Sequence, residues 1–181
     1  MAKSSALIIR PAGADDVAAI TAIYADHVLH GTASFDTVPR SHAATRDKLN
    51  ECVGRHWPFL VAEKDGAVVG YAYATQFRDR PAYANACENS IYVASARRGE
   101  GIGTALLTAL VQQAEANGFR QMIAVIGGGE PASIAVHARA GFEHAGRMKA
   151  VGWKFGRWLD TVYMQRTLGE GDSKPPDRKL R

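Results

Sequence analysis

The stretch that decides the fold of this chain is Ile91-Tyr92-Val93-Ala94-Ser95-Ala96-Arg97-Arg98-Gly99-Glu100-Gly101-Ile102-Gly103-Thr104. Its first residues are strand formers, its glycines predict a tight turn, and apolar residues then recur at helical spacing, at Ile102, Leu106, Leu110 and Ala114. A strand, a turn and a long helix in this order form a crossover, which makes this strand parallel to the next one in the sheet. The unbonded N–H groups and the dipole of the helix start suit a phosphate or a pyrophosphate.

Glycine spacing separates this turn from two familiar nucleotide-binding motifs. A dinucleotide fingerprint needs a third glycine where Leu106 stands, and a P-loop needs a Gly-Lys-Ser/Thr sequence that is absent here. On these residues alone, a plain strand-to-helix turn without a ligand stays open as the alternative.

Strand and helix signals alternate along the rest of the chain. The Asp65-Gly66 dipeptide predicts a hairpin turn, and the apolar run from Met122 to Ile126 predicts a strand buried on both faces. The expected strands cover residues 7–10, 59–63, 67–73, 90–93 and 122–126 and two segments that meet near 152–156 and end at 164, and the expected helices cover 17–28, a segment after the N-cap Ser41, 102–116 and 133–139. The fold class is α/β (α+β type), with a mixed, twisted sheet of about six or seven strands and helices on both faces.

Length and composition indicate one domain. The chain has 181 residues and is 46% hydrophobic with a net charge of +4, which excludes disorder for most of it. We expect the domain to cover residues 1–168 and a flexible tail to cover 169–181, because the segment after Leu168 is rich in glycine, proline and charge. No apolar run is long enough for a transmembrane helix or a secretory signal, so we expect no membrane partner.

Charge and cysteine usage narrow the class further. The sequence pI is about 9.2, but acidic and basic residues are interspersed outside the tail, so we expect no nucleic-acid partner. Cys52 and Cys87 give neither a disulfide framework nor metal-ligand spacing. We therefore expect no metal and a cytoplasmic location.

Two motifs carry a family resemblance. Arg98-x-x-Gly101-x-Gly103 after an apolar strand resembles the acyl-CoA pyrophosphate motif of the GNAT superfamily of N-acetyltransferases, and Ser133-x-x-x-His137-x-x-x-Gly141-Phe142 resembles its final motif. From about Ile9 to Met164 the chain is similar to the phosphinothricin acetyltransferase branch, which includes methionine sulfoximine and sulfone acetylases. Further stretches agree in order and spacing: Phe59-Leu60-Val61-Ala62-Glu63, Glu88-Asn89-Ser90-Ile91-Tyr92-Val93, Ala124-Val125-Ile126-Gly127 and Gly152-x-Lys154-x-Gly156-x-Trp158-x-Asp160.

The resemblance implies that acetyl-CoA is the co-substrate. In this family the fourth and fifth strands splay apart and the pantetheine arm lies between them. The implied cofactor-binding residues are Ile91, Tyr92, Val93, Arg98, Gly99, Glu100, Gly101, Ile102, Gly103, Thr104, Glu130 and Ser133. Glu130 is a departure, because the superfamily has an asparagine there and a carboxylate cannot donate the same hydrogen bond.

The resemblance also implies the catalytic pair. Acetyl transfer needs a neutral amine, and Glu88 stands where the branch keeps its catalytic glutamate, so Glu88 is the expected general base. His137 is the expected proton donor to the thiolate leaving group. The alternatives are a surface carboxylate and a packed or capping histidine. Cys87 adjoins Glu88, but we expect a buried strand cysteine and direct attack in a ternary complex.

Residues Phe35, Arg78, Arg80 and Tyr83 are the expected substrate-binding set, with a solvated loop and core packing as the alternatives. They suit the α-amino transfer to a small glutamate- or methionine-like amino acid that the resemblance implies, and the family's habit suggests a homodimer. Two other functions stay open: acetylation of another amine, such as a peptide N-terminus or a polyamine, and a CoA-binding regulatory module without turnover.

Overall fold

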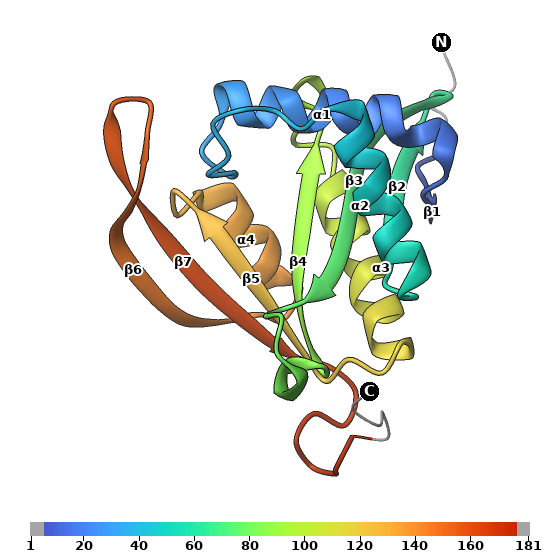
Figure 1. Cartoon of the computed structure of the whole chain (residues 1–181), viewed down its shortest axis with the longest axis vertical. Helices are drawn as coiled ribbons and strands as arrows, with labels where there is room; N and C mark the ends of the chain where they lie inside the picture. The colour runs from blue at the N-terminus through green and yellow to red at the C-terminus, as the bar shows by residue number, and fades with distance from the viewer. Residues whose placement is uncertain (1–5, 177–181) are drawn as a thin grey trace.

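Seven strands form one sheet in the computed structural model, which describes residues 6–176 (Figure 1). Their bounds are β1 Ile8–Pro11, β2 Phe59–Lys64, β3 Ala67–Gln76, β4 Ala86–Val93, β5 Gln121–Gly127, β6 Glu143–Lys154 and β7 Arg157–Thr167. They lie in the order β1-β2-β3-β4-β5-β7-β6. β4 and β5 are parallel, as the crossover predicts, and the other neighbouring pairs are antiparallel.

Helices cover both faces of this sheet, so the predicted fold class is confirmed (Figure 1). α1 (Val17–His30) and α2 (His42–Gly54) lie on one face, and α3 (Ile102–Ala116) and α4 (Pro131–Arg139) lie on the other. Three short 3₁₀ turns complete the list: η1 Ala14–Asp16, η2 Pro81–Tyr83 and η3 Ser95–Arg97. Within residues 6–176, no helix is long and apolar enough to cross a bilayer.

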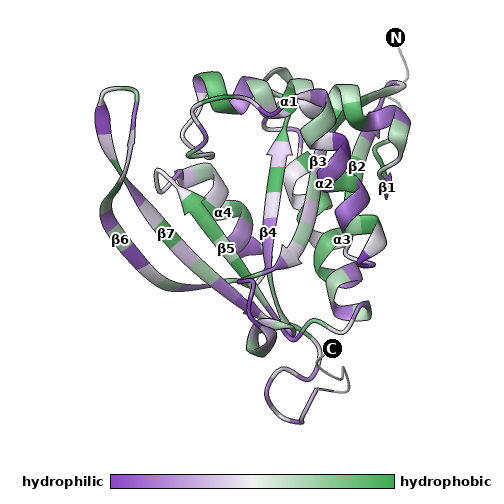
Figure 2. Cartoon of the chain, in the orientation of Figure 1, coloured by the Kyte–Doolittle hydropathy of each residue, from purple (hydrophilic) through white to green (hydrophobic). Residues whose placement is uncertain are grey.

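Each face has its own hydrophobic core. Leu106, Leu107 and Leu110 of α3 are fully buried against the sheet, together with Met122 of β5. The other core packs α1 and α2 against the aromatic rings of β2 and β3. In Figure 2, hydrophobic residues are prominent on β5 and α3, and hydrophilic ones are prominent on α2. Removal of this apolar surface from water is the main stabilising contribution.

Two local signals behave as the sequence predicts. The hydroxyl of Ser41 accepts a hydrogen bond from the N–H of Ala44 at 3.1 Å and so caps α2. Asp65 and Gly66 have φ values of 54° and 74°, the left-handed conformation that a two-residue hairpin turn requires between β2 and β3.

One expectation about β5 is only half correct. Met122, Ala124 and Ile126 are buried, but Ile123 and Val125, on the opposite face, are only partly buried. Val125 borders a cavity, described below, so this face of the strand is not fully covered by packing.

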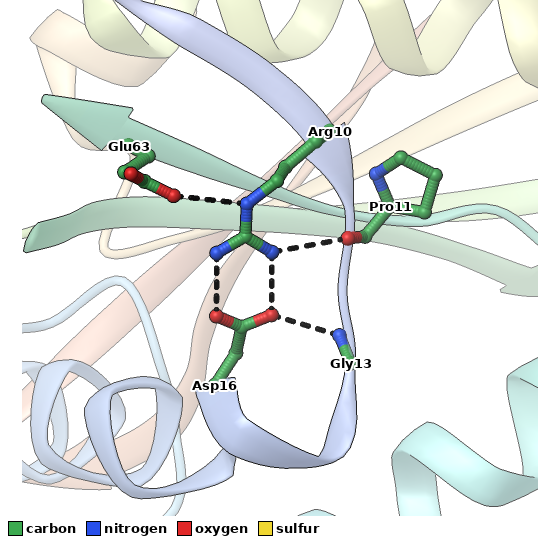
Figure 3. A network of polar contacts seen from close by, with 5 residues as sticks. All are labelled: Arg10, Pro11, Gly13, Asp16 and Glu63. Atoms are coloured by element: carbon green, nitrogen blue, oxygen red, sulfur yellow. Dashed lines mark hydrogen bonds and ion pairs between the residues drawn. The ribbon is translucent and has the colours of Figure 1, made fainter. Parts of the chain in front are cut away.

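Arg10 fixes the point at which the chain leaves β1 and enters α1 (Figure 3). Its guanidinium donates to both carboxylate oxygens of Asp16 at 2.8 Å and to Glu63 of β2 at 2.9 Å. The Arg10 guanidinium holds the pKa of Asp16 below its usual range, and the N–H of Gly13, which also donates to that carboxylate, lowers this pKa further. The start of α1 is therefore tied to the edge of the sheet.

Candidate active site

The parallel pair β4–β5 opens into a cavity. Pairing between the two strands runs from Ala86 opposite Gln121 to Asn89 opposite Ala124 and stops there. Beyond that point the strands diverge (Figure 1). A cavity of about 420 Å³ lies at the opening, and we call it the splay cavity. Its lining includes Glu88, Asn89, Ser90, Ile91, Tyr92, Ala124, Val125, Ile126, Gly127, Ser133, His137, Phe35, Arg40 and Tyr73.

The loop between α1 and α2 forms one wall of this cavity. Lys154, near the tip of the β6–β7 hairpin, is buried and donates to the carbonyl oxygens of Gly31 at 2.9 Å and Ser34 at 2.7 Å. Phe35 packs so closely on Gly152 that a Cβ atom there would lie 2.4 Å from the ring. The hairpin therefore sets the position of Phe35, which the sequence places in the substrate site.

The turn before α3 has the geometry of an anion site. Gly99 and Gly101 have φ values of 82° and 79°, which glycine adopts without strain. The first backbone hydrogen bond of the helix runs from the N–H of Ala105 to the carbonyl of Gly101, so the preceding N–H groups point out of the helix end. A Cβ atom on either glycine would meet no protein atom within 4 Å. Open space and unbonded donors fit a diphosphate.

Side chains around this turn divide into paired and exposed ones. Glu100 binds Lys64 at 2.6 Å and Arg97 at 2.9 Å, and Arg97 also contacts Asp65 at 3.2 Å. These pairings leave the backbone of Glu100 as its means of contact with a ligand. Arg98 is exposed beside the turn.

The remaining predicted cofactor residues lie in three places. Ile102 is buried in the core, and Gly103 and Thr104 are half-buried in the first turn of α3. Ile91 and Tyr92 line the splay cavity, whereas Val93 lies at the end of β4, where its carbonyl contacts His27 Nε2 at 2.9 Å. Ser133 lines the cavity from α4, and Glu130 occupies the N-cap of that helix without capping it through its side chain.

Glu88 and its neighbours on β4 point to alternate faces of the sheet. Glu88, Ser90 and Tyr92 project toward α1 and α2, and Cys87, Asn89 and Ile91 project toward α3 and α4. Burial raises the pKa of the Glu88 carboxyl above its usual range, and the nearby Arg78 charge opposes that rise. A carboxylate with a raised pKa is a better proton acceptor near neutral pH.

His137 lies on the opposite face of the sheet from Glu88. Its Nε2 is 3.0 Å from Oδ1 of Asn89, and its Nδ1 is 2.8 Å from the carbonyl oxygen of Ser133. Burial lowers the pKa of His137, whereas the Ser133 carbonyl raises it. The two side chains reach the same cavity from opposite sides, because the cavity passes between the strands.

Arg78, Arg80 and Tyr83 lie on the loop between β3 and β4, and their side chains are exposed rather than part of the cavity lining. The side-chain amide of Gln76 donates to the carbonyls of Arg78 at 2.7 Å and Arg80 at 3.0 Å, which holds this loop against the strand end. The Tyr83 ring packs edge-on against Phe77, 5.7 Å between centroids.

Unlike Arg78 and Arg80, the cationic side chain of Arg40 lines the cavity, and the sequence did not predict it. The Arg40 guanidinium lies 4.4 Å from the centre of the Tyr24 ring, 3.4 Å from the Tyr73 hydroxyl and 3.8 Å from Asp36. Lys48 of α2 lies beside it. One signal was available, because Arg40 immediately precedes the N-cap of α2, where a positive charge opposes the helix dipole.

Cys87 is unsuited to carry an acetyl group. It is fully buried on the face away from Glu88, and burial raises the pKa of its thiol well above the usual range. A thiol rather than a thiolate is a poor nucleophile. Among the described residues, no group of three or more His, Cys, Asp or Glu side chains could hold a metal ion.

Splayed parallel strands joined by a glycine turn at a helix start define an enzyme that takes its acyl group from a CoA thioester. Residues 9–163 match the family described as acetyltransferase (GNAT) domain, and the chain belongs to this family. It is an acetyl-CoA-dependent N-acetyltransferase. The resemblance found in the sequence is thereby confirmed.

Similar proteins agree over almost the whole chain. A phosphinothricin N-acetyltransferase of Alcaligenes faecalis is 47% identical over 173 residues, which cover 95% of this chain and 88% of that protein. An L-methionine sulfoximine/L-methionine sulfone acetyltransferase of Pseudomonas aeruginosa is 40% identical over 168 residues, 92% of this chain and 98% of that protein. The crystal structure of a phosphinothricin acetyltransferase from Sinorhizobium meliloti in complex with AcCoA matches with a TM-score of 0.94 and 48% identity, over 97% of this chain and 96% of that one.

Proposed function

We propose that this enzyme acetylates the α-amino group of a small amino acid with a polar or acidic side chain, such as phosphinothricin, methionine sulfoximine or methionine sulfone. One observation carries the proposal: Glu88 lines the splay cavity together with the cationic Arg40 of the α1–α2 loop, and Arg78 of the β3–β4 loop lies near enough for its charge to lower the pKa of Glu88. The names of the similar enzymes support the same substrate class.

The two cationic groups suit the two polar ends of such a substrate. An α-carboxylate is adjacent to the α-amine, so an amine at Glu88 brings the carboxylate toward Arg78, with Arg80 and Tyr83 on the same loop. The side chain of the substrate then extends along β4 toward Tyr92 and Arg40. Glu88 and Tyr92 are four residues apart, so their Cα atoms are about 13 Å apart along an extended strand. The side chains that project into the cavity leave a shorter distance for the substrate to cover. Phe35 forms the apolar wall between the two ends.

The proposed reaction is direct attack of the amine on the thioester carbonyl. Glu88 takes a proton from the substrate ammonium, directly or through one water, and the neutral nitrogen forms the C–N bond to the thioester carbonyl. The C–S bond then breaks, and the nitrogen releases its second proton to solvent to leave the neutral amide. His137 gives a proton to the departing thiolate. The N–H groups from Gly99 to Thr104 and the exposed Arg98 hold the diphosphate. The edge of β4 that faces β5, which has no strand partner beyond Asn89, holds the pantetheine arm at Ile91 to Val93. Acetyl-CoA supplies the activated acetyl group.

A substrate panel tests this proposal. Thiol release from acetyl-CoA is measured with phosphinothricin, methionine sulfone, methionine sulfoximine, common amino acids, a polyamine and a peptide. We expect the highest kcat/KM with the first three. Preference for the polyamine or the peptide would overturn the substrate class, and acetyl-CoA binding without thiol release from any amine would favour the regulatory alternative.

Replacement of Arg40 tests the distal end of the site. In Arg40→Gln we expect KM for methionine sulfone to rise about tenfold with little change in kcat, because a hydrogen bond to a charged group contributes about 1.5 kcal/mol. Arg46→Gln in the following helix α2 is the control, since Arg46 is exposed and outside the cavity lining. Steady-state kinetics measure both variants, and equal KM values in the two would place the substrate elsewhere.

We also propose that the enzyme is a homodimer built on the β6–β7 hairpin. Five large apolar side chains of this hairpin are exposed: Met148, Val151, Trp153, Phe155 and Trp158. A patch of this kind is typical of an interface. Sedimentation analysis should give twice the chain mass of 19.5 kDa. Trp158→Glu should shift the enzyme to monomer, and Val53→Glu, an equally exposed apolar site on α2, should not. A wild-type monomer would contradict the proposal.

A cytoplasmic location is part of the same proposal. Cys52 and Cys87 are both free and buried, which fits a reducing compartment.

Acetylation turns a cationic amine into a neutral amide, so we propose that the enzyme gives resistance to amino-acid analogues whose toxicity requires the free amine.

A further inference from the structure

Asn89 makes a buried contact with His137 that the roles proposed above do not use. The two side chains come from β4 and α4, are 6% and 4% exposed, and face each other with Oδ1 of Asn89 3.0 Å from Nε2 of the ring. Sequence reasoning assigned Asn89 no role. A buried asparagine next to a proton donor can control where that proton resides.

The direction of the Asn89 amide is fixed by a third group. Its Nδ2 donates to the carbonyl oxygen of Ile123 on β5, at 3.3 Å. If the amide were reversed, Oδ1 would face that carbonyl, and two acceptors would oppose each other. Oδ1 therefore points at Nε2, and an oxygen at 3.0 Å from Nε2 requires that nitrogen to carry a proton.

The other ring nitrogen also faces an acceptor. Nδ1 lies 2.8 Å from the Ser133 carbonyl oxygen. The Ser133 hydroxyl oxygen also lies 3.4 Å from Nδ1 and can donate to it, so a neutral ring protonated on Nε2 satisfies Asn89 and Ser133 together. An imidazolium also donates from Nε2 to Asn89, and its Nδ1–H donates to the Ser133 carbonyl. Both forms therefore carry a proton on Nε2, and burial favours the neutral one.

We propose that Asn89 is a positioning residue that keeps a proton on Nε2 of His137 and so maintains the ring as a proton donor. The inference rests on the proposed role of His137 toward the thiolate. Nε2 is the nitrogen held by a side chain of the cavity lining, and both Asn89 and His137 border the cavity in which the thiolate would form. Asn89 acts through His137 and need not touch the acetyl group.

Other charges on the elements packed around the ring are few. β4 contributes Glu88, on the opposite face of the sheet, and α3 contributes Glu115 in its last turn. α4 contributes the exposed Arg139, and Arg166 of β7 binds the carbonyl of Ala140 just after α4. Glu88 is the one of these four that shares the cavity with His137, so its titration must be resolved from that of the ring.

NMR of the free enzyme tests the inference without any substrate. The ¹⁵N shifts of His137 report which nitrogen carries a proton, and their pH dependence gives the pKa of the ring. We expect protonated Nε2 in the wild type throughout the titration. In Asn89→Ala the pKa of His137 should fall by about one unit, because one hydrogen bond to the charged ring is lost. In Asn89→Asp it should rise, since a carboxylate replaces the amide.

Cys87→Ala is the matched control, because Cys87 is buried on the same face of β4 two residues away. It should leave the His137 shifts unchanged. In the kinetics, the alkaline limb of the kcat profile should move to lower pH in Asn89→Ala and stay in place in Cys87→Ala. An unprotonated Nε2 in the wild type, or the same His137 pKa in folded Asn89→Ala, would overturn the inference. If Asn89→Ala does not fold, Asn89→Asp and the wild-type spectrum decide.

This design separates the inference from the proposed function. If Asn89 controls the ring but no amino acid is acetylated, the NMR result stands and the substrate panel fails. If amino acids are acetylated but the His137 shifts ignore Asn89, the substrate proposal stands and the positioning role is wrong.

Discussion

Glu88→Gln should lower kcat by about a hundred- to ten-thousandfold, the range that one positioned general base contributes. Glutamine keeps the shape of the side chain but cannot accept the ammonium proton, so the amine stays a poor nucleophile. Binding of acetyl-CoA should not change, because Glu88 projects toward α1 and α2 whereas the diphosphate turn lies at the start of α3. Stopped-flow or steady-state kinetics with calorimetric binding measure the two quantities separately.

The pH profile gives the same prediction a second readout. Burial raises the pKa of Glu88, and the base works only when deprotonated, so activity should fall as the pH drops through that raised pKa. Arg78 opposes the rise, so Arg78→Gln should move the acidic limb to higher pH. Arg80→Gln is the control, because it removes one positive charge from the same loop. The acidic limb of its pH–activity profile should stay where it is in the wild type.

Two results would remove Glu88 from this role. Equal losses of kcat and of acetyl-CoA affinity in Glu88→Gln would indicate a structural side chain. An acidic limb that persists unchanged in Glu88→Gln would mean that another group is the base.

The fold was predictable because its decisive signals are local. The strand, the glycine turn and the helix from Ile91 onward lie within one segment, and the crossover rule turns them into a parallel pair. The hairpin turn at Asp65-Gly66 is likewise set by two adjacent residues. The partial burial of Ile123 and Val125 was not predictable, since apolar residues beside a cavity look the same in sequence as residues in a core.

The residues of the candidate site could be proposed from the sequence only where a family motif marks them. Glu88, His137 and the glycines of the α3 turn each belong to such a motif. Arg40 belongs to none of them. Asn89 lies in the same family stretch as Glu88, but the stretch does not show its role, because that role depends on a contact between distant segments. Asn89 meets His137 across 48 positions of the chain, and Arg40 meets Tyr73 across 33. Rules of periodicity and motif spacing do not predict contacts between residues so far apart in the sequence.

Gly101→Ala should weaken acetyl-CoA binding by about ten- to a hundredfold. The new methyl group would occupy space that no protein atom fills within 4 Å, which is where we place the diphosphate oxygens. Gly101 also has φ 79°, so alanine there strains the turn and displaces the N–H groups that contact the ligand. Loss of one or two hydrogen bonds to a charged group corresponds to about 1.5–3 kcal/mol, or roughly one to two factors of ten in Kd.

The effect of backbone strain in Gly101→Ala must be separated from the effect of losing the contact with the diphosphate. Gly118→Ala is the matched control for the strain. Gly118 lies just beyond the other end of α3 with φ 85°, and a Cβ atom there also meets nothing within 4 Å. Gly118→Ala should therefore lower Tm about as much as Gly101→Ala does. Calorimetric titration with acetyl-CoA should show weaker binding only in Gly101→Ala. Equal Kd values in the two variants would mean that the α3 turn does not hold the diphosphate, because the backbone strain is the same and only the position differs.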